Sequence, residues 1–358
     1  MTQIYQQNVH GGTSTAAKDG RYAGSYAFES QVDLGTLAGI AGAELYALVE
    51  GGWPDVGGID APAVGNYFGV NADAIEGEWG ELSELWFEQA LFDRTLLFRF
   101  GKIDLAGGFE CRGCEAAFDG NKYANDETTQ FLNGALVNNP TIPFPDRTLG
   151  LALFGSPAEA WHLGLAVAAR DDEDTSWGSA NDGVFAILEG TFLPRYEWVG
   201  PMAEGQYRAG VWYSADRNND AVGGDQRGVY LSASQPVWCR EGNSEDSRAL
   251  SLFARAGWTD GPGAELADFW SFGAQYQGLW NPDGSDVLGI GLARGNFVHA
   301  SDPDAPVGSE TVWELYYNMP ITSEIVLSPS VQYIIDPGGD HGGKDALVLG
   351  LRLQIDLE

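Results

Sequence analysis

Immediately before the last residue, Glu358, the sequence reads LVLGLRLQIDL at 347–357, and two kinds of side chain alternate along these eleven residues. The odd-numbered positions are all apolar: Leu347, Leu349, Leu351, Leu353, Ile355 and Leu357. The even-numbered positions are Val348, Gly350, Arg352, Gln354 and Asp356. A period of two places these sets on opposite faces of a β-strand, whereas an α-helix needs a period of 3.6. The stretch therefore predicts a strand with one wholly apolar face.

The same alternation recurs along the chain, most clearly at 207–214, 250–258, 310–320 and 325–335. These stretches exceed the usual strand length of about 5–6 residues, and a tilted strand of about 9–11 residues crosses a bilayer. The apolar faces of these and other alternating stretches often end in an aromatic ring, as at Trp161, Trp258, Trp280 and Tyr333. Since aromatic rings favour the lipid–water boundary, the pattern is typical of a transmembrane β-barrel.

Extending the pattern over the whole chain predicts about sixteen strands. They fall near 2–10, 22–34, 40–53, 81–91, 95–104, 148–155, 161–170, 184–193, 205–216, 227–237, 248–260, 268–280, 286–297, 310–320, 324–335 and 346–357. Short connectors alternate with longer or more acidic ones near 11–21, 54–80, 105–147, 171–183, 217–226, 261–267, 298–309 and 336–345. Such alternation indicates an antiparallel up-and-down barrel with short turns at one end. We therefore predict an all-β transmembrane barrel that takes in residues 1–358 as a single unit, with both termini at the short-turn end.

Composition narrows the alternatives. The chain has 358 residues and a formal net charge of -32, which repels phosphate and disfavours nucleic acid as a partner. Aromatic residues at 12% exclude a disordered acidic chain. Length alone suggests two or three soluble domains of roughly 150 residues each, or one large β unit. A soluble β-sandwich is the main rival, although its strands would be shorter and fewer.

The two ends of the sequence bear on localisation. Met1 is followed by Thr-Gln-Ile-Tyr-Gln-Gln, which lacks the charged start and apolar core of a secretion signal. We therefore expect either a cytoplasmic protein or an exported one whose signal is absent from this sequence. The ending Leu357-Glu358 does not identify the native C-terminus.

Several stretches resemble the carbohydrate-selective porins of the OprB type. One is FGKID at 100–104, and a second runs from FDGNKYANDETTQFLN at 118–133 to TIPFP at 141–145. A third is PGG at 337–339 followed by ALVLGLR at 346–352, and the Gly11-Gly12 region and WELYY at 313–317 match more loosely. The resemblance covers most of the chain in order.

The resemblance implies a passive, sugar-preferring channel in the outer membrane of a Gram-negative bacterium, with a long loop folded inward. The connector at 105–147 fits this constriction loop by its length, because loops this long inside a compact unit are usually functional. The expected partners are outer-membrane lipids and mono- or oligosaccharides, and the barrel is expected as a monomer or a homotrimer. Two features depart from the family: Cys111-Arg112-Gly113-Cys114 inside the loop, and the absence of a terminal aromatic residue.

The predicted lumen face supplies the candidate pore-lining and substrate-contacting residues. If the apolar faces meet lipid, the opposite faces point inward with mixed Arg, carboxylate, amide and aromatic side chains. The candidates are Glu29, Glu44, Glu88, Arg99, Arg147, Glu189, Arg208, Trp212, Arg255, Glu314, Tyr316, Gln332 and Arg352. Such a mixture suits sugar hydroxyls, which both donate and accept hydrogen bonds. The alternative for each residue is a solvated charge that only sets pore size and field.

No sequence motif indicates catalysis or a cofactor, so we predict no enzyme. GGDHGGKD at 338–345 resembles a phosphate-binding loop, but Asp345 replaces the required Ser or Thr and a strand follows. DRNND at 216–220 starts like a calcium loop, yet Ala221 and Arg227 occupy the positions of its Gly and Glu. Loose binding of a divalent cation by the acidic outer loops stays an alternative. Cys111 and Cys114 are expected to form a small disulfide rather than a metal half-site, with Cys239 as a free thiol.

The sequence therefore predicts an outer-membrane channel for passive diffusion of carbohydrates. One alternative is a general or cation-preferring porin of the same architecture. The other is a carbohydrate-acting enzyme or lectin, either soluble or built on a barrel, because a pair of catalytic carboxylates is not excluded by composition.

Overall fold

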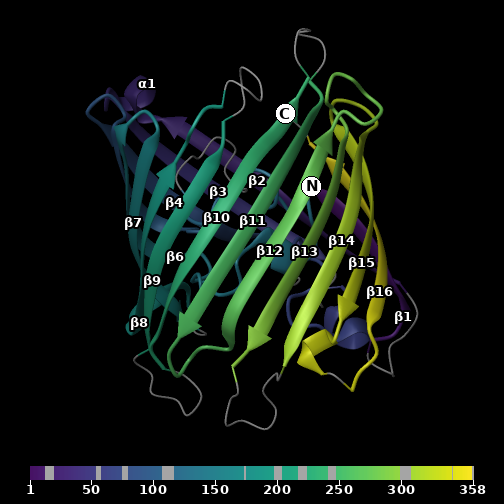
Figure 1. The fold of residues 1–358 in the computed structure, drawn as a ribbon. Coiled ribbons are helices and arrows are strands. Elements are labelled where there is room, and N and C mark those ends of the chain that lie inside the picture. Colours follow the sequence, from purple (N-terminus) through teal and green to yellow (C-terminus); the bar gives the residue numbers. More distant parts are fainter. Residues whose placement is uncertain are drawn as a thin grey trace.

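The computed structural model of the chain is a closed barrel of sixteen antiparallel strands, each paired with its neighbours in sequence (Figure 1). The structure describes residues 1–12, 20–53, 58–74, 80–106, 117–172, 175–196, 204–216, 224–240, 247–298, 308–340 and 342–356. The sheet that the alternating pattern predicts is thus confirmed, and so is its up-and-down order.

The strands follow the predicted ranges closely. They are β1 (Thr2–His10), β2 (Arg21–Asp33), β3 (Ala43–Trp53), β4 (Glu81–Leu91), β5 (Leu96–Ile103), β6 (Thr148–Ala158), β7 (Trp161–Asp172), β8 (Thr175–Phe192), β9 (Gln206–Asp216), β10 (Gln226–Cys239), β11 (Ala249–Asp260), β12 (Leu266–Gln277), β13 (Val287–Phe297), β14 (Ser309–Pro320), β15 (Ile325–Ile335) and β16 (Ala346–Ile355). Short helical turns are α1 (Leu34–Ala38), η1 (Asp60–Val64), α2 (Gly134–Val137) and η2 (Pro337–Gly339). No helix in these described stretches is long and apolar enough to cross a membrane.

The two ends of the chain close the barrel. Thr2 pairs with Gln354 and the register continues to His10 opposite Leu347, with one irregularity between Asn8 and His10. The amide of Ile355 also donates to the carbonyl of Met1 at 2.9 Å. Both termini lie at the upper rim in Figure 1, the end that carries α1 and the short turns, as the sequence predicts.

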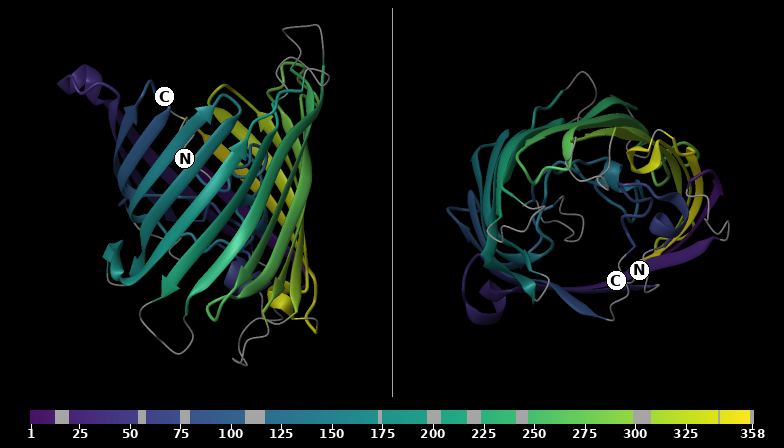
Figure 2. Two further views of the ribbon diagram at one scale, coloured as in Figure 1. Left: turned by 60° about the vertical axis from the view of Figure 1, so that its left-hand side comes forward. Right: turned by 90° about the horizontal axis from the view of Figure 1, so that it is seen from below.

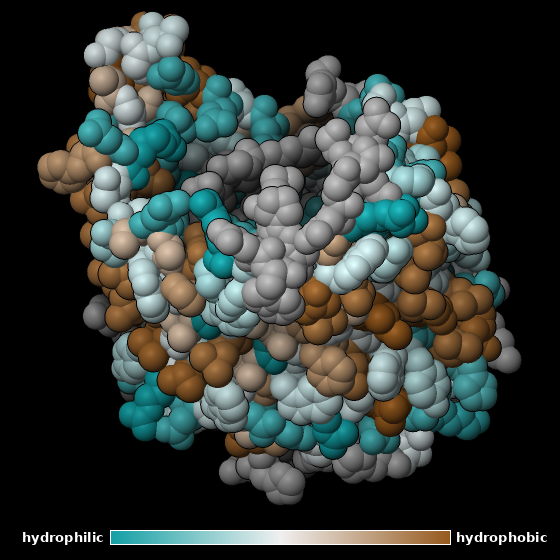
Figure 3. Space-filling view, turned by 45° about the horizontal axis from the view of Figure 1, so that its top comes forward, coloured by the Kyte–Doolittle hydropathy of each residue, from teal (hydrophilic) through white to brown (hydrophobic). Residues whose placement is uncertain are grey.

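The outer face of the wall is an apolar belt. One row of paired residues crosses six strands, from Leu153 through Leu165, Leu188, Val211 and Val229 to Trp258. These side chains remain exposed in the isolated chain, with Leu165 at 45% and Leu188 at 50%. Brown, hydrophobic residues gather across the middle of the wall in Figure 3. Apolar surface on this scale indicates contact with lipid.

Two segments lie inside the ring of strands, as the end-on view of Figure 2 shows. We call residues 58–74 the short inner segment, and the described residues 104–106 and 117–147 the long inner segment. The two contact each other, because Ala72 donates its amide to Leu132 O at 2.7 Å and Gly134 donates to Gly69 O at 3.3 Å. The predicted inward fold of the 105–147 connector is confirmed for its described part. The inward course of the 54–80 connector is an addition that the sequence reading did not make.

One predicted connector is wrong. The stretch 171–183 is no loop, since β7 runs to Asp172 and β8 begins at Thr175. Arg170 pairs with Ser179 and Asp172 with Thr175, so the two strands continue as a hairpin. Backbone pairing needs no apolar face, and the alternation that marks the membrane-facing part of a strand therefore stops before the strand does.

The apolar belt yields a stability prediction. Leu165→Arg places a charge within the row of exposed apolar side chains, and we expect it to destabilise the folded barrel in lipid by about 2–4 kcal/mol. Reversible urea unfolding in phospholipid vesicles measures the change. Gln31→Arg, at an exposed lumen-facing position on β2, serves as the control and should shift stability by less than about 0.5 kcal/mol. Equal stabilities of the two variants would contradict a lipid-facing role for Leu165.

Candidate functional site

The thirteen candidate residues all face the lumen or border it. Twelve lie on strands at positions that alternate with the outward-facing residues, and Arg147 immediately precedes β6. Nine are at most about a twentieth exposed: Glu88, Arg99, Glu189, Trp212, Arg255, Glu314, Tyr316, Gln332 and Arg352. What covers these side chains therefore decides what they can do.

Glu314, Gln332 and Arg352 hold the turn of the long inner segment against the wall. The Glu314 carboxylate accepts the amides of Leu132 at 2.9 Å and Asn133 at 2.8 Å. Gln332 accepts from the side chain of Asn133 at 3.0 Å. Arg352 donates to the carbonyls of the same segment, at Glu127 and Gln130. Charged hydrogen bonds to backbone groups are among the stronger ones, so this part of the wall is an anchor.

A second anchor joins β8, β9 and β10 to the start of the same segment. Glu189 accepts the amide of Asp119 at 2.8 Å and the hydroxyl of Tyr230 at 2.7 Å. Arg208 pairs with Glu189 at 2.5 Å and donates to the carbonyl of Ala117 at 3.1 Å. Glycine at position 210 makes the Tyr230 contact possible, since a Cβ there would lie 2.3 Å from the tyrosine ring.

Arg255 on β11 forms the centre of the buried polar contacts. Its guanidinium lies 3.3 Å from the Asp119 carboxylate and donates to Leu136 O at 2.8 Å and to Asn125 Oδ1 at 2.6 Å. Asp119 also accepts the amide of Asn139 at 3.1 Å. Arg255 thus ties together two parts of the long inner segment, at Asp119 and at Leu136.

Apolar packing reinforces the polar anchors. Phe131 meets Tyr316 edge-on at 4.9 Å and Phe253 at 5.4 Å. Elsewhere Trp212 stacks near Phe185 at 6.4 Å, in a cluster that also takes in Leu105, Phe118 and Ile142 of the long inner segment. The candidate aromatic residues Trp212 and Tyr316 therefore contact protein in this structure.

Glu88 and Arg99 form an ion pair within the wall itself. Their side chains lie 2.8 Å apart on the paired strands β4 and β5, and both are about 6% exposed. The Arg99 guanidinium also lies 3.9 Å from the centre of the Trp86 ring. Stacking of a guanidinium on an aromatic face adds to the attraction of the pair.

The short inner segment has its own anchors, which the sequence reading missed. Glu310 accepts the amides of Tyr67 at 2.7 Å and Phe68 at 3.2 Å. Gln6 and Gln332 both donate to the carbonyl of Val70 at 2.8 Å. In the sequence, only the unusual length of the 54–80 connector pointed to this segment. A side chain whose partner is a backbone amide or carbonyl belongs to no recognisable motif.

Glu29 and Glu44 remain accessible. Glu29 is exposed on the lumen face of β2, and Glu44 accepts from Gln31 at 2.9 Å. Arg94, in the short turn between β4 and β5, lies 3.7 Å from Glu44. These two candidates therefore lie toward the short-turn mouth rather than beneath the inner segments.

An interior cavity of about 230 Å³ lies between the inner segments. All of its described lining residues belong to those segments, from Ala72 to Arg147, and its charged groups are Asp104, Glu127, Asp146 and Arg147. Phe144 and Asn138 add an aromatic ring and an amide. Of the sequence-predicted candidates only Arg147 lines it, and the three carboxylates and Asn138 are additions. We call this the interior cavity.

Arg147 is held in an uncommon conformation at the edge of the interior cavity. Its φ is 47°, in the left-handed region that non-glycine residues rarely adopt. Its guanidinium pairs with Glu50 of β3 at 2.9 Å and keeps a side-chain exposure of 19%. Such backbone conformations persist only where surrounding contacts impose them, and they concentrate at functional sites.

Carboxyl groups on the inner segments titrate unusually. Burial raises the pKa of Asp119 to about 6, although the neighbouring Arg255 acts in the opposite direction. Burial likewise raises the pKa of Asp60 and of Asp73 to about 6, against hydrogen bonds that lower it. These groups are therefore close to their protonation point in mildly acidic medium.

Some expectations fall outside the described residues. These are the disulfide between Cys111 and Cys114 and most of the acidic loop after Asp216. Cys239, by contrast, is described and is a free, half-buried thiol. Across the described parts of the chain, no group of three His, Cys, Asp or Glu side chains could hold a metal ion.

A closed sixteen-stranded barrel with an apolar outer belt and anchored inner segments defines a porin, a class of outer-membrane channel. The chain belongs to the carbohydrate-selective porin, OprB family, whose family model matches residues 17–357. It is thus a carbohydrate-selective outer-membrane porin, and as a member of a family of channels it is not an enzyme.

Individual relatives are distant in sequence. The chain is 24% identical to Porin B of Pseudomonas aeruginosa, over 94% of this chain and 82% of the relative. It is 23% identical to Porin AaxA of Chlamydia trachomatis, over 67% of this chain and 50% of that protein. The high-pH structure of Pseudomonas putida OprB superposes with a TM-score of 0.79 at 20% identity, over 99% of this chain and 92% of that one. At that identity the likeness supports the fold.

The Glu314 anchor predicts a measurable loosening. Glu314→Ala leaves the amides of Leu132 and Asn133 without their acceptor, so we expect peptides covering 128–137 to exchange hydrogen at least about ten-fold faster. Hydrogen-exchange mass spectrometry in detergent measures this, and the strands should keep their protection. Glu29→Ala removes a carboxylate from another part of the lumen face and should leave 128–137 unchanged. Undiminished protection in Glu314→Ala would refute the anchoring role.

Proposed function

We propose that sugars cross the barrel by way of the interior cavity and that the long inner segment, within 105–147, forms the constriction. The observation that carries the proposal is the lining of the cavity: three carboxylates, one guanidinium, one amide and one aromatic ring within about 230 Å³. This volume is below the ≈300–1,000 Å³ typical of pockets for drug-sized ligands, which favours passage of single sugar units.

The chemistry of the lining suits a neutral polyol. Sugar hydroxyls donate to Asp104 and Glu127 and accept from Arg147, while the Phe144 ring meets their C–H faces. Passive conduction requires that such contacts be strong enough to admit the solute and weak enough to release it. The direction of net flow then follows the concentration gradient alone.

The thirteen candidate residues divide into three roles in this proposal. Arg147 contacts solute at the constriction, and Glu29 and Glu44 contact it near the short-turn mouth. Arg208 and seven of the nine buried candidates set the width of the channel through the inner segments that they contact. The Glu88–Arg99 ion pair stabilises the wall. Contact of any of the thirteen with a sugar stays a prediction.

A second candidate function, a cation-preferring channel, has one observation in its favour. The interior cavity carries three carboxylates against one guanidinium, and the whole chain has a net charge of -32. Cations would then be concentrated in the lumen relative to anions. The two functions differ in whether neutral sugars compete with ions for the constriction.

Liposome swelling across a graded series of neutral and charged solutes tests the proposal. We expect monosaccharides to permeate faster than charged solutes of equal size, and Arg147→Met to abolish much of this preference because the guanidinium that donates to hydroxyls is lost. In planar bilayers the same variant should conduct more current and shift the reversal potential in a salt gradient toward cations.

Arg195→Met is the matched control. Arg195 is 68% exposed, pairs with Glu159 at 3.1 Å and lies between β8 and β9, away from the interior cavity. The Arg195→Met substitution removes the same positive charge as Arg147→Met. It should leave the swelling rates and the reversal potential as they are in the unmodified protein. Permeation that follows solute size alone, unaffected by Arg147→Met, would rule out the proposed constriction.

A homotrimer is the assembly that we propose for testing. The apolar outer belt would suit a second copy of the chain as well as lipid. Native mass spectrometry from a mild detergent should then give three chains per particle. A single chain at every protein concentration would establish a monomer.

A further inference from the structure

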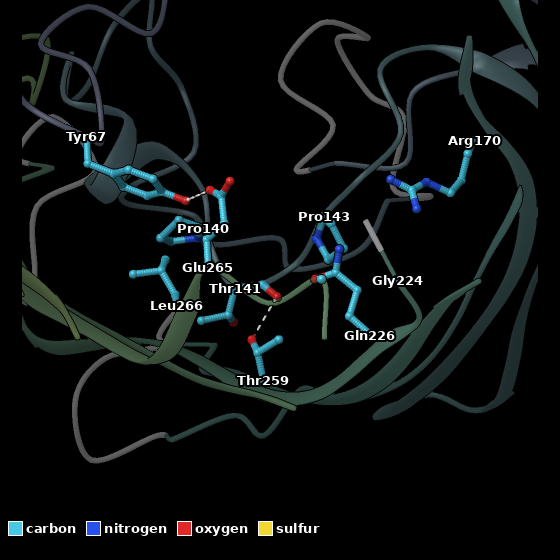
Figure 4. Close-up of a pocket in the computed structure, with 11 residues that line it drawn as sticks. Tyr67, Pro140, Thr141, Pro143, Arg170, Gly224, Gln226, Thr259, Glu265 and Leu266 are labelled. Carbon is cyan, nitrogen blue, oxygen red and sulfur yellow. Dashed lines mark hydrogen bonds between the residues drawn. The ribbon is translucent and has the colours of Figure 1, made fainter. Parts of the chain in front are cut away.

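A second cavity, of about 400 Å³, lies at the long-loop end of the barrel and shares no described lining residue with the interior cavity. We call it the vestibule cavity. It lies between the inner segments and the strand ends of β7, β10, β11 and β12 (Figure 4).

One end of the vestibule cavity is rigid and acidic. The Tyr67 hydroxyl donates to Glu265 Oε2 at 2.5 Å, which fixes the carboxylate and leaves its second oxygen as an acceptor. Tyr67 itself is held by the hydrogen bond that its backbone N–H donates to the Glu310 carboxylate at 2.7 Å and by edge-on contact with the Phe297 ring at 4.9 Å. Burial raises the pKa of Tyr67, and Glu265 raises it further, so the hydroxyl stays a donor.

The rest of the vestibule cavity supplies complementary groups. Arg170, at the opposite end from Glu265 in Figure 4, brings a guanidinium. Gln226 adds an amide that both donates and accepts. Thr259 donates to the carbonyl of Thr141 at 3.3 Å, which ties the wall to the long inner segment there.

The distribution of charge selects the class of ligand. One guanidinium and one carboxylate give the described lining no net charge, so net charge favours neither an anion nor a cation. Pro140, Pro143 and the Tyr67 ring provide apolar surfaces between polar groups, which matches the alternating C–H and hydroxyl surface of a sugar. The volume lies within the ≈300–1,000 Å³ range of pockets for small ligands.

We propose that the vestibule cavity is a docking subsite for a neutral mono- or disaccharide at the long-loop mouth of the channel, separate from the constriction. The proposal rests on the assignment of the chain as a carbohydrate channel. Its consequence is kinetic, because a subsite at the mouth allows sugar flux to saturate at a lower sugar concentration than the constriction alone would give.

Saturable uptake of a radiolabelled hexose or disaccharide into proteoliposomes tests the proposal. Gln226→Ala and Glu265→Ala each remove hydrogen-bonding groups from the cavity, and we expect the double variant to raise the half-saturating concentration by about five-fold. Flux at saturating sugar should fall by less than about two-fold, since the constriction is untouched. Ion conductance without sugar, near that of the unmodified protein, verifies that the barrel has formed.

Asp260→Ala is the matched control. Asp260 follows Thr259 on β11, lies on the outward face, is 71% exposed and pairs with Arg227 at 2.5 Å. It removes one carboxylate from the same rim without touching the cavity and should leave the half-saturating concentration unchanged. If Asp260→Ala shifted the half-saturating concentration as much as the double variant does, the subsite would be overturned. The shift would then reflect loss of negative charge anywhere on the rim.

The remaining outcomes distinguish failure of the vestibule subsite from failure of the assignment as a carbohydrate channel. Saturable flux in the unmodified protein with no shift in the double variant would overturn the subsite and leave the channel assignment intact. Sugar flux in the unmodified protein no faster than in protein-free liposomes would overturn both. A shift in Gln226→Ala alone, which changes no charge, would support recognition by hydrogen bonding.

Discussion

The pairing of β1 with β16 is the constraint on which the rest of the structure depends. In hydrocarbon each unpaired backbone group costs several kcal/mol, so a sheet of this size is stable in a membrane only when it has no edge. Closure fixes an outside that meets lipid and an inside that does not. The apolar belt and the charged lumen are both consequences of that division.

Closure also explains why so many charged side chains can be buried. Glu314, Arg255 and Arg352 would be costly on the outer wall, but inside they find backbone amides and carbonyls of the inner segments. The described inner segments lie outside the sixteen strands and need acceptors and donors from the wall. The wall and the inner segments supply each other's hydrogen-bond partners, which is why the inner segments follow the wall rather than leave the barrel.

Sequence alone was enough to predict the wall. Alternation located the strands and placed residues such as Glu314 and Arg352 on the correct face, since a strand has only two faces. It was silent on what those side chains touch, because the partners are backbone groups of segments without any period. The interior cavity arises only from the folded course of those segments, so Asp104 and Glu127 could not be recognised beforehand. The hairpin of Arg170 and Ser179 escaped notice because, beyond the lipid, strands need not alternate.

The anchors also have a mechanical meaning. Hydrogen bonds between strands set the perimeter of a barrel but leave its cross-section free to flatten, as with any thin-walled tube. The inner segments span the interior from Glu50 and Glu84 on one part of the ring to Glu314 and Arg352 on another. They act as cross-braces that resist flattening under lateral pressure, so the bore of this tube is set from within rather than by the surrounding bilayer.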